Sequence, residues 1–144
     1  MSSRSFVALV DDDIHSARLL TRMLLAHGSP EVRWFDGAST GMAEIGVTLA
    51  EPGATTPAMV IVDLKASSEA TRDFVADLRK LEGAAEFLTV ALAPALDKDV
   101  RDVLIDAGVD AVFQRHSDLD PYRREVASIV SYWVRNQRLN AIGA

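Results

Sequence analysis

The stretch FVALVDDD, residues 6–13, runs from five apolar residues directly into three aspartates. A short apolar run of this length is typical of a buried strand. The residues that follow, 14–27, have apolar side chains at helical spacing and end before Gly28, which favours a helix end. The stretch therefore predicts a strand, an acidic turn and a helix, in that order.

The same pattern repeats four more times along the chain. Further apolar runs occur at residues 32–35, 59–62, 88–93 and 111–113. Segments with helical periodicity follow them, at residues 38–50, 69–81, 98–107 and 120–139. Five strand–helix pairs predict an α/β fold, a doubly wound five-stranded parallel sheet with helices on both faces. We expect a single domain over residues 1–144, with its core at about 6–130 and its last helix reaching about 139.

Composition excludes several classes of function. The 144 residues carry a net charge of -6, which argues against binding to nucleic acid or to an anionic membrane, because both require a basic face. The absence of cysteine excludes disulfides, thiolate metal sites and cysteine nucleophiles. The first apolar run is too short for a signal peptide or a membrane span. We therefore expect a cytoplasmic protein.

Carboxylates follow two of the predicted strands at their carboxyl ends. Asp11 and Asp12 come after the first strand, and Asp63 comes after the run at 59–62. Because ligands of such sheets bind beyond the carboxyl ends of the strands, we expect these side chains to crowd one cleft. A carboxylate cluster repels itself unless a cation joins it, and Mg²⁺ suits oxygen ligands. The alternative is structural, since an aspartate such as Asp13 can cap the following helix.

At this point the residues match a known family. The stretches FVALVDDDIH (6–15), MVIVDL (59–64) and AGVDAVF (107–113) resemble the receiver domain of bacterial response regulators. The resemblance covers about residues 6–129. It implies a flavodoxin-like (βα)5 fold with strand order 2-1-3-4-5.

The resemblance also implies roles for the acidic residues. Asp63 matches the phosphoacceptor, which takes a phosphoryl group from a histidine kinase, a phosphotransfer protein or a small donor. Asp12 and Asp63 would bind Mg²⁺, with Asp11 acting through water and the backbone carbonyl of Lys65 completing the protein ligands. The output would pass to a downstream protein partner, and the only chemistry would be on Asp63 itself, not turnover of a foreign substrate.

The sequence departs from the family at several positions that transmit the signal. Ala93 stands where receivers carry a Thr or Ser hydroxyl, and Arg115 replaces a Lys. His116 replaces the following Pro, so we expect a trans peptide bond there, because a cis bond before a non-proline residue costs about 2.5–4 kcal/mol. The aromatic switch position is Val112, and Phe113 should point to the opposite face of the sheet.

Three further features extend the prediction. Lys65 lies two residues after Asp63, so its ammonium either reaches the phosphoryl site or is a solvated surface group. Arg115 should pair with the carboxylates. The last helix carries an apolar stripe that ends near Trp133 and is longer than a five-residue strand requires. We expect its excess length to form a surface for a homodimer or a partner.

Three hypotheses for function follow. The first is a phosphorylatable receiver that uses Asp63 and Mg²⁺ in a phosphorelay. The second is a degenerate receiver that acts as a phosphorylation-independent interaction module, motivated by Ala93, Val112 and His116. The third is a phosphatase of the haloacid-dehalogenase type, because Asp11 and Asp13 have the spacing of its nucleophile and acid/base pair.

Overall fold

The computed structural model describes the backbone of residues 5–143 and the side chains of residues 5–137. Five strands and five helices alternate along the chain. The strands are β1 (Phe6–Asp11), β2 (Val32–Phe35), β3 (Pro57–Asp63), β4 (Leu88–Ala93) and β5 (Ala111–Gln114). The helices are α1 (Ile14–Ala26), α2 (Ala38–Ala50), α3 (Ala70–Leu78), α4 (Lys98–Ala107) and α5 (Leu119–Gly143), with a short 3₁₀ helix at Ala84–Glu86. Residues 1–4 and 144 of the predicted domain lie outside the described residues.

All strand pairs are parallel, and the sheet order is β2-β1-β3-β4-β5. This confirms the predicted fold class and strand order. The order reverses between β1 and β3, and in such sheets ligands bind beyond the carboxyl ends of the strands at this point. In the β1–β3 register, Asp11 lies directly opposite Asp63. The topology therefore brings the two predicted acidic segments to one point at the edge of the sheet.

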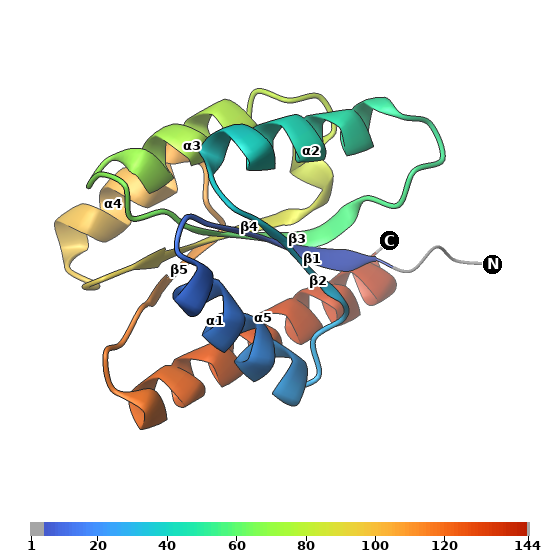
Figure 1. The fold of residues 1–144 in the computed structure, drawn as a ribbon. Helices are drawn as coiled ribbons and strands as arrows, with labels where there is room; N and C mark the ends of the chain where they lie inside the picture. The colour runs from blue at the N-terminus through green and yellow to red at the C-terminus, as the bar shows by residue number, and fades with distance from the viewer. Residues whose placement is uncertain (1–4, 144) are drawn as a thin grey trace.

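The sheet separates two apolar layers, as Figure 1 shows, with α2, α3 and α4 on one face and α1 and α5 on the other. Each face has its own cluster of buried side chains. β1 is buried along its whole length because helices cover it on both sides. Val112 belongs to the first cluster and Phe113 packs against the second, which confirms that the two side chains point to opposite faces.

Capping residues set the start of α1 and the end of α4. Asp13 Oδ1 accepts hydrogen bonds from the backbone N–H groups of His15 and Ser16, so Asp13 is the N-cap of α1, as the structural alternative expected. Gly108 ends α4 with φ at 124°, and a Cβ there would lie 2.6 Å from Cγ of Arg79. A glycine is required at that position both for the backbone conformation and for space.

The last helix differs from the prediction. α5 extends to Gly143 and not to about 139. No helix of the described residues combines the length and the apolar character that crossing a membrane requires. The predicted stripe is buried, but Tyr132 also packs inward, with its ring 6.0 Å from that of Phe113 at an interplanar angle of 68°. Trp133 and Val134 are partly buried against the same cluster. Part of the expected surface thus packs on the protein's own core, and its use by a homodimer or a partner stays a prediction.

Candidate functional site

Two carboxylates meet at the switch point of the sheet, and both are fully buried. Asp11 ends β1 and Asp63 ends β3, and the side chain of each has an exposed fraction of 0%. Two neighbouring carboxylates without water require positive charge or hydrogen-bond donors, because burial and mutual repulsion both disfavour their ionised forms. The remaining residues of the site supply these donors.

Lys65 places its ammonium group between the two carboxylates. Its Nζ lies 2.7 Å from Asp11 Oδ1 and 3.0 Å from Asp63 Oδ2, and it donates to the backbone carbonyl of Asp63 at 2.9 Å. Only 24% of the Lys65 side chain is exposed. The interpretation of Lys65 as a solvated surface residue is therefore wrong, since its charged end lies inside the carboxylate cluster.

Arg115 holds the other oxygen of Asp63. Its Nε donates to Asp63 Oδ1 at 2.9 Å, which confirms the expected pairing with the carboxylates. The backbone N–H of Arg115 donates to the carbonyl of Ala93 at 2.8 Å, so the residue after β5 is fixed beside the end of β4. With Lys65 on one oxygen and Arg115 on the other, each carboxylate oxygen of Asp63 is engaged by a cation.

Asp12 binds the loop after β3. Its carboxylate accepts hydrogen bonds from the backbone N–H of Lys65, with 3.0 Å to each oxygen, and from the backbone N–H of Ala66 at 2.9 Å. Thr71 supports the same loop, because its Oγ1 accepts from the N–H of Leu64 at 3.1 Å. The side chains of Asp12 and Thr71 thus hold the backbone on both sides of Lys65.

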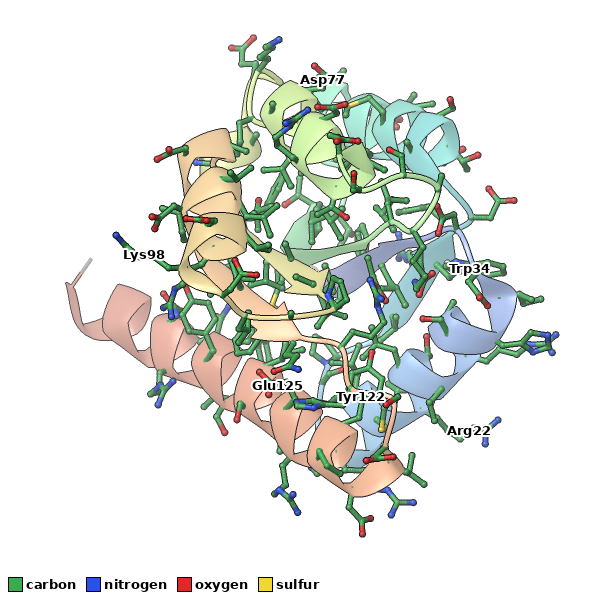
Figure 2. All side chains as sticks on the ribbon, turned by 90° about the vertical axis from the view of Figure 1, so that its left-hand side faces the viewer. Arg22, Trp34, Asp77, Lys98, Tyr122 and Glu125 are labelled. Atoms are coloured by element: carbon green, nitrogen blue, oxygen red, sulfur yellow. The ribbon has the colours of Figure 1, made fainter. Side chains whose placement is uncertain are left out.

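Two residues that the sequence interpretation missed complete the site. Ser16 Oγ donates to Asp11 Oδ2 at 2.8 Å and lies 3.3 Å from Asp63 Oδ2. Trp34 lies on β2, and its indole N–H donates to the backbone carbonyl of Asp11 at 2.8 Å. Figure 2 shows Trp34 beside α1. Ser16 could have been found from its place in the first turn after the aspartates. No local signal identifies Trp34, because only the β1–β2 pairing brings it there.

The electrostatic environment shifts the titration of several groups. Burial, together with the negative charge of Asp63, raises the pKa of Asp11 above its ordinary value, although hydrogen bonds from Lys65, the Asp13 N–H and Ser16 lower it. Hydrogen bonds from the backbone N–H groups of Ser16 and His15 lower the pKa of Asp13. Burial, followed by the negative charge of Asp63 and Asp11, raises the pKa of Tyr122, which therefore stays a neutral phenol.

Tyr122 lies next to this region with its hydroxyl buried. The residue is 4% exposed, and its hydroxyl has no hydrogen-bond partner among the described residues. Figure 2 places it on the first turns of α5, on the side that faces the sheet. It contributes mainly apolar packing to the layer formed by α1 and α5.

The arrangement does not fit the predicted Mg²⁺ ion. That prediction used Asp11, Asp12, Asp63 and the backbone carbonyl of Lys65 as ligands. In the structure the Lys65 ammonium occupies the space between Asp11 and Asp63, and Asp12 is bound by backbone amides. No group of three or more Asp, Glu or His side chains in the described part of the chain is arranged to hold a metal ion. The predicted ligands are thus engaged by other groups in this structure, and Mg²⁺ binding stays a prediction.

The positions that depart from receivers lie around this cluster. Ala93 is buried at the end of β4 and offers no hydroxyl. The Arg115–His116 peptide is trans, as predicted, because the described residues contain no cis peptide bond. His116 Nε2 lies 3.1 Å from Glu125 Oε1 on α5, so the loop after β5 is attached to the last helix.

A cavity adjoins the outer side of the ion pairs. It has a volume of about 580 Å³ and lies between the loop after β3, α3, α4 and the end of β4. Lys65, Ala93 and Arg115 line it, together with apolar side chains such as Val103 of α4. The carboxylate cluster and the surface between α3 and α4 thus share two residues, Lys65 and Arg115.

Comparison with known proteins gives the fold a place. No protein-family model and no curated protein sequence matches the chain. Several solved structures match it closely in shape. A phosphorylated cyanobacterial phytochrome response regulator, RcpA, is 20% identical, with a TM-score of 0.76 over 92% of this chain and 95% of that one.

Two other solved structures agree with it. The Mn²⁺-bound form of the response regulator Rcp1 is 19% identical, with a TM-score of 0.72 over 90% of this chain and 94% of that one. A CheY-like receiver domain protein from Methanospirillum hungatei is 17% identical, with a TM-score of 0.72 over 96% of this chain and 99% of that one. At this level of identity the agreement concerns the fold. The chain has the fold of the response-regulator receiver domains.

Proposed function

We propose that this protein is a signalling module of the receiver type that acts through protein contacts, with Asp63 held in ion pairs and not presented as a phosphoryl acceptor. The observation that carries the proposal is the engagement of both Asp63 oxygens, Oδ1 by Arg115 at 2.9 Å and Oδ2 by Lys65 at 3.0 Å. We propose no turnover of a foreign substrate.

The chemistry of phosphoryl transfer explains why this engagement matters. A carboxylate oxygen that attacks phosphorus must approach it in line with the leaving oxygen. Asp63 has an exposed fraction of 0%, so neither oxygen can approach a donor unless a cation moves away first. Ala93 provides no hydroxyl for the transferred group. These features favour the phosphorylation-independent interpretation of the sequence.

The surface that would signal lies next to this cluster. Lys65 and Arg115 line the cavity between α3 and α4, and Val103 of α4 is 45% exposed beside it. A partner that binds this surface would contact Lys65 and Arg115, the two cations of the ion pairs. A downstream protein therefore remains the kind of partner that we propose.

A second candidate function is phosphoryl acceptance on Asp63 from a histidine kinase or a phosphotransfer protein. One observation favours it: Lys65 and Arg115 are each about one quarter exposed at the cavity, so both could turn toward a group that enters there. The third hypothesis, a phosphatase, has less support. Asp13 would be its acid/base residue, but this carboxylate caps α1 through two backbone N–H groups.

Intact-mass measurement after incubation with a small phosphodonor such as acetyl phosphate, with and without Mg²⁺, tests the proposal. We expect the unmodified mass for the wild-type protein and for Asp63→Asn. Asp73→Asn is a matched control, because Asp73 is an exposed aspartate that pairs only with Arg72 at the surface. A gain of one phosphoryl group in the wild type and in Asp73→Asn, but not in Asp63→Asn, would refute the proposal and establish the second candidate.

A further inference from the structure

We propose that Lys65 is a built-in cation that takes the place of a divalent ion between Asp11 and Asp63. The inference goes beyond the proposed function, because it concerns how the buried carboxylates are neutralised whether or not a partner or a phosphodonor is present. Its consequence is that the protein keeps its native site without Mg²⁺, and that loss of the Lys65 charge creates a divalent cation site.

The contacts of the ammonium group support this role. A lysine ammonium has three N–H donors and no acceptor. Lys65 Nζ has three oxygens within hydrogen-bond distance, which are Asp11 Oδ1 at 2.7 Å, the Asp63 carbonyl at 2.9 Å and Asp63 Oδ2 at 3.0 Å. Two of these contacts are hydrogen bonds, to Asp11 Oδ1 and to the Asp63 carbonyl, and the third is the ion pair with Asp63 Oδ2, so the ammonium is held by oxygens of both acidic residues.

The charges of the two fully buried carboxylates are balanced without any added ion. Asp11 and Asp63 are the fully buried carboxylates, and Lys65 and Arg115 are the cations that contact them. The Asp12 carboxylate is satisfied separately by the backbone N–H groups of Lys65 and Ala66. A divalent ion in addition to Lys65 would leave the cluster with excess positive charge.

The site also has too little space for the Lys65 ammonium and a Mg²⁺ ion at the same time. Mg²⁺ binds oxygen at about 2.0–2.1 Å, so it would need to lie between the same oxygens that the ammonium now contacts. The short distances from Nζ to Asp11 and to Asp63 leave no room for a second cation between them. Binding of Mg²⁺ would therefore require the Lys65 side chain to leave the site.

The loop geometry holds Lys65 in this position. Asp12 accepts from the Lys65 backbone N–H, and Thr71 Oγ1 accepts from the preceding N–H, that of Leu64. The side chain then turns back toward its own strand and reaches the carbonyl of Asp63, two residues earlier. The hydrogen bonds to the N–H groups of Leu64 and Lys65 thus position the backbone from which the Lys65 side chain reaches the carboxylates.

Calorimetric titration of the wild-type protein with MgCl₂ and with MnCl₂ is the first test, and it contains no phosphodonor. We expect the titration to give no saturable heat of binding. In thermal unfolding, we expect either salt to raise the midpoint no more than NaCl of equal ionic strength does. Saturable one-to-one binding to the wild type that Asp63→Asn abolishes would overturn the inference. Such a result would leave the proposed function standing, because a bound ion is not a phosphoryl group.

A gain of binding provides the second test. Lys65→Met keeps an unbranched side chain, one atom shorter, and removes its charge. Lys80→Met is the matched control, because Lys80 is 77% exposed and its recorded ion pair is with Asp77. We expect Lys65→Met to bind Mn²⁺ one-to-one at least ten times more tightly than the wild type. We expect Lys80→Met to behave as the wild type. A folded Lys65→Met that binds no more tightly than the wild type would overturn the inference.

Thermal unfolding keeps the test decisive if Lys65→Met is unstable without metal. We expect its thermal midpoint to be lower than that of the wild type and to rise as MgCl₂ is added, which the double variant Lys65→Met/Asp63→Asn should not show. In the double variant one negative charge is removed together with the positive one, so it should fold without metal. Equal responses of the single and double variants to MgCl₂ would contradict a site made by Asp63.

Discussion

Arg115 Nε lies 2.9 Å from Asp63 Oδ1, although the two residues are 52 positions apart in the sequence and their strands are not neighbours in the sheet. β4 lies between β3 and β5 in the sheet. The backbone N–H of Arg115 donates to the carbonyl of Ala93, which fixes Arg115 beside the end of β4. The contact between Arg115 and Asp63 therefore depends on the arrangement of β3, β4 and β5. This ion pair links the predicted acceptor to the last part of the sheet.

Arg115→Met should therefore destabilise the protein by about 3 kcal/mol, because it leaves a buried carboxylate with one cation in place of two. This is the lower end of the usual range, since one quarter of the Arg115 side chain is exposed. Urea unfolding gives the free energy. Arg72→Met is the control, as its pair with Asp73 is exposed and should be worth less than about 1 kcal/mol. Similar losses for both variants would contradict the buried ion pair.

Ser16→Ala should cost about 1–3 kcal/mol, although it removes a single oxygen atom. The hydroxyl donates to Asp11 Oδ2 at 2.8 Å, and a buried charged acceptor that loses its donor keeps its desolvation cost. Ser128→Ala removes an exposed hydroxyl whose recorded hydrogen bond goes to the Arg124 carbonyl of its own helix, so its effect should stay within about 0.5 kcal/mol. Chemical denaturation of the two variants compares them, and equal effects would argue against a role for Ser16.

The N-cap Asp13 should make stability sensitive to acid. Hydrogen bonds from Ser16 and His15 hold its pKa below the ordinary value of 3.8. A carboxyl whose pKa is lowered by folding stabilises the protein fully above its unfolded pKa, and this contribution is lost as pH falls through the folded value. Asp13→Asn caps the helix without titrating.

Urea unfolding from neutral pH to about pH 3 measures this effect as a difference between the wild type and Asp13→Asn. We expect the wild type to lose stability more steeply below pH 3.8, whereas groups common to both proteins cancel. Parallel curves over the whole range would show that the cap does not depend on the charge of Asp13.

Two glycines of α2 should respond in opposite ways to the same change. Gly46→Ala should stabilise the protein by about 0.5–1 kcal/mol, because a Cβ there meets nothing within 4 Å and alanine favours helix. At Gly41 a Cβ would lie 3.0 Å and 3.1 Å from the two methyl groups of Val10, which is fully buried in β1. Overpacking of about 1–3 kcal/mol should then cancel or exceed the gain in helix propensity. Thermal melts of the two variants should separate in this order.

This contrast also shows the limit of the helix prediction. Glycine costs about 1 kcal/mol relative to alanine in a helix interior, yet α2, which contains Gly41 and Gly46, begins and ends where the periodicity predicted. Gly41 allows the helix to approach β1, and this contact with Val10 offsets its weak propensity. Helix propensity is a local property, whereas the distance between a helix and a sheet is set by tertiary packing.

Local pattern was sufficient for the order of elements, the parallel sheet and the convergence of Asp11 with Asp63, because apolar periodicity and the handedness of strand–helix–strand connections leave few alternatives. The direction of the Lys65 side chain, the rotation of Asp12 toward backbone amides and the contacts of Ser16 and Trp34 were decided only in the folded protein. These contacts join residues from separate strands and loops. Their geometry depends on the need to neutralise and hydrogen-bond buried carboxylates, which no single segment of the chain can satisfy.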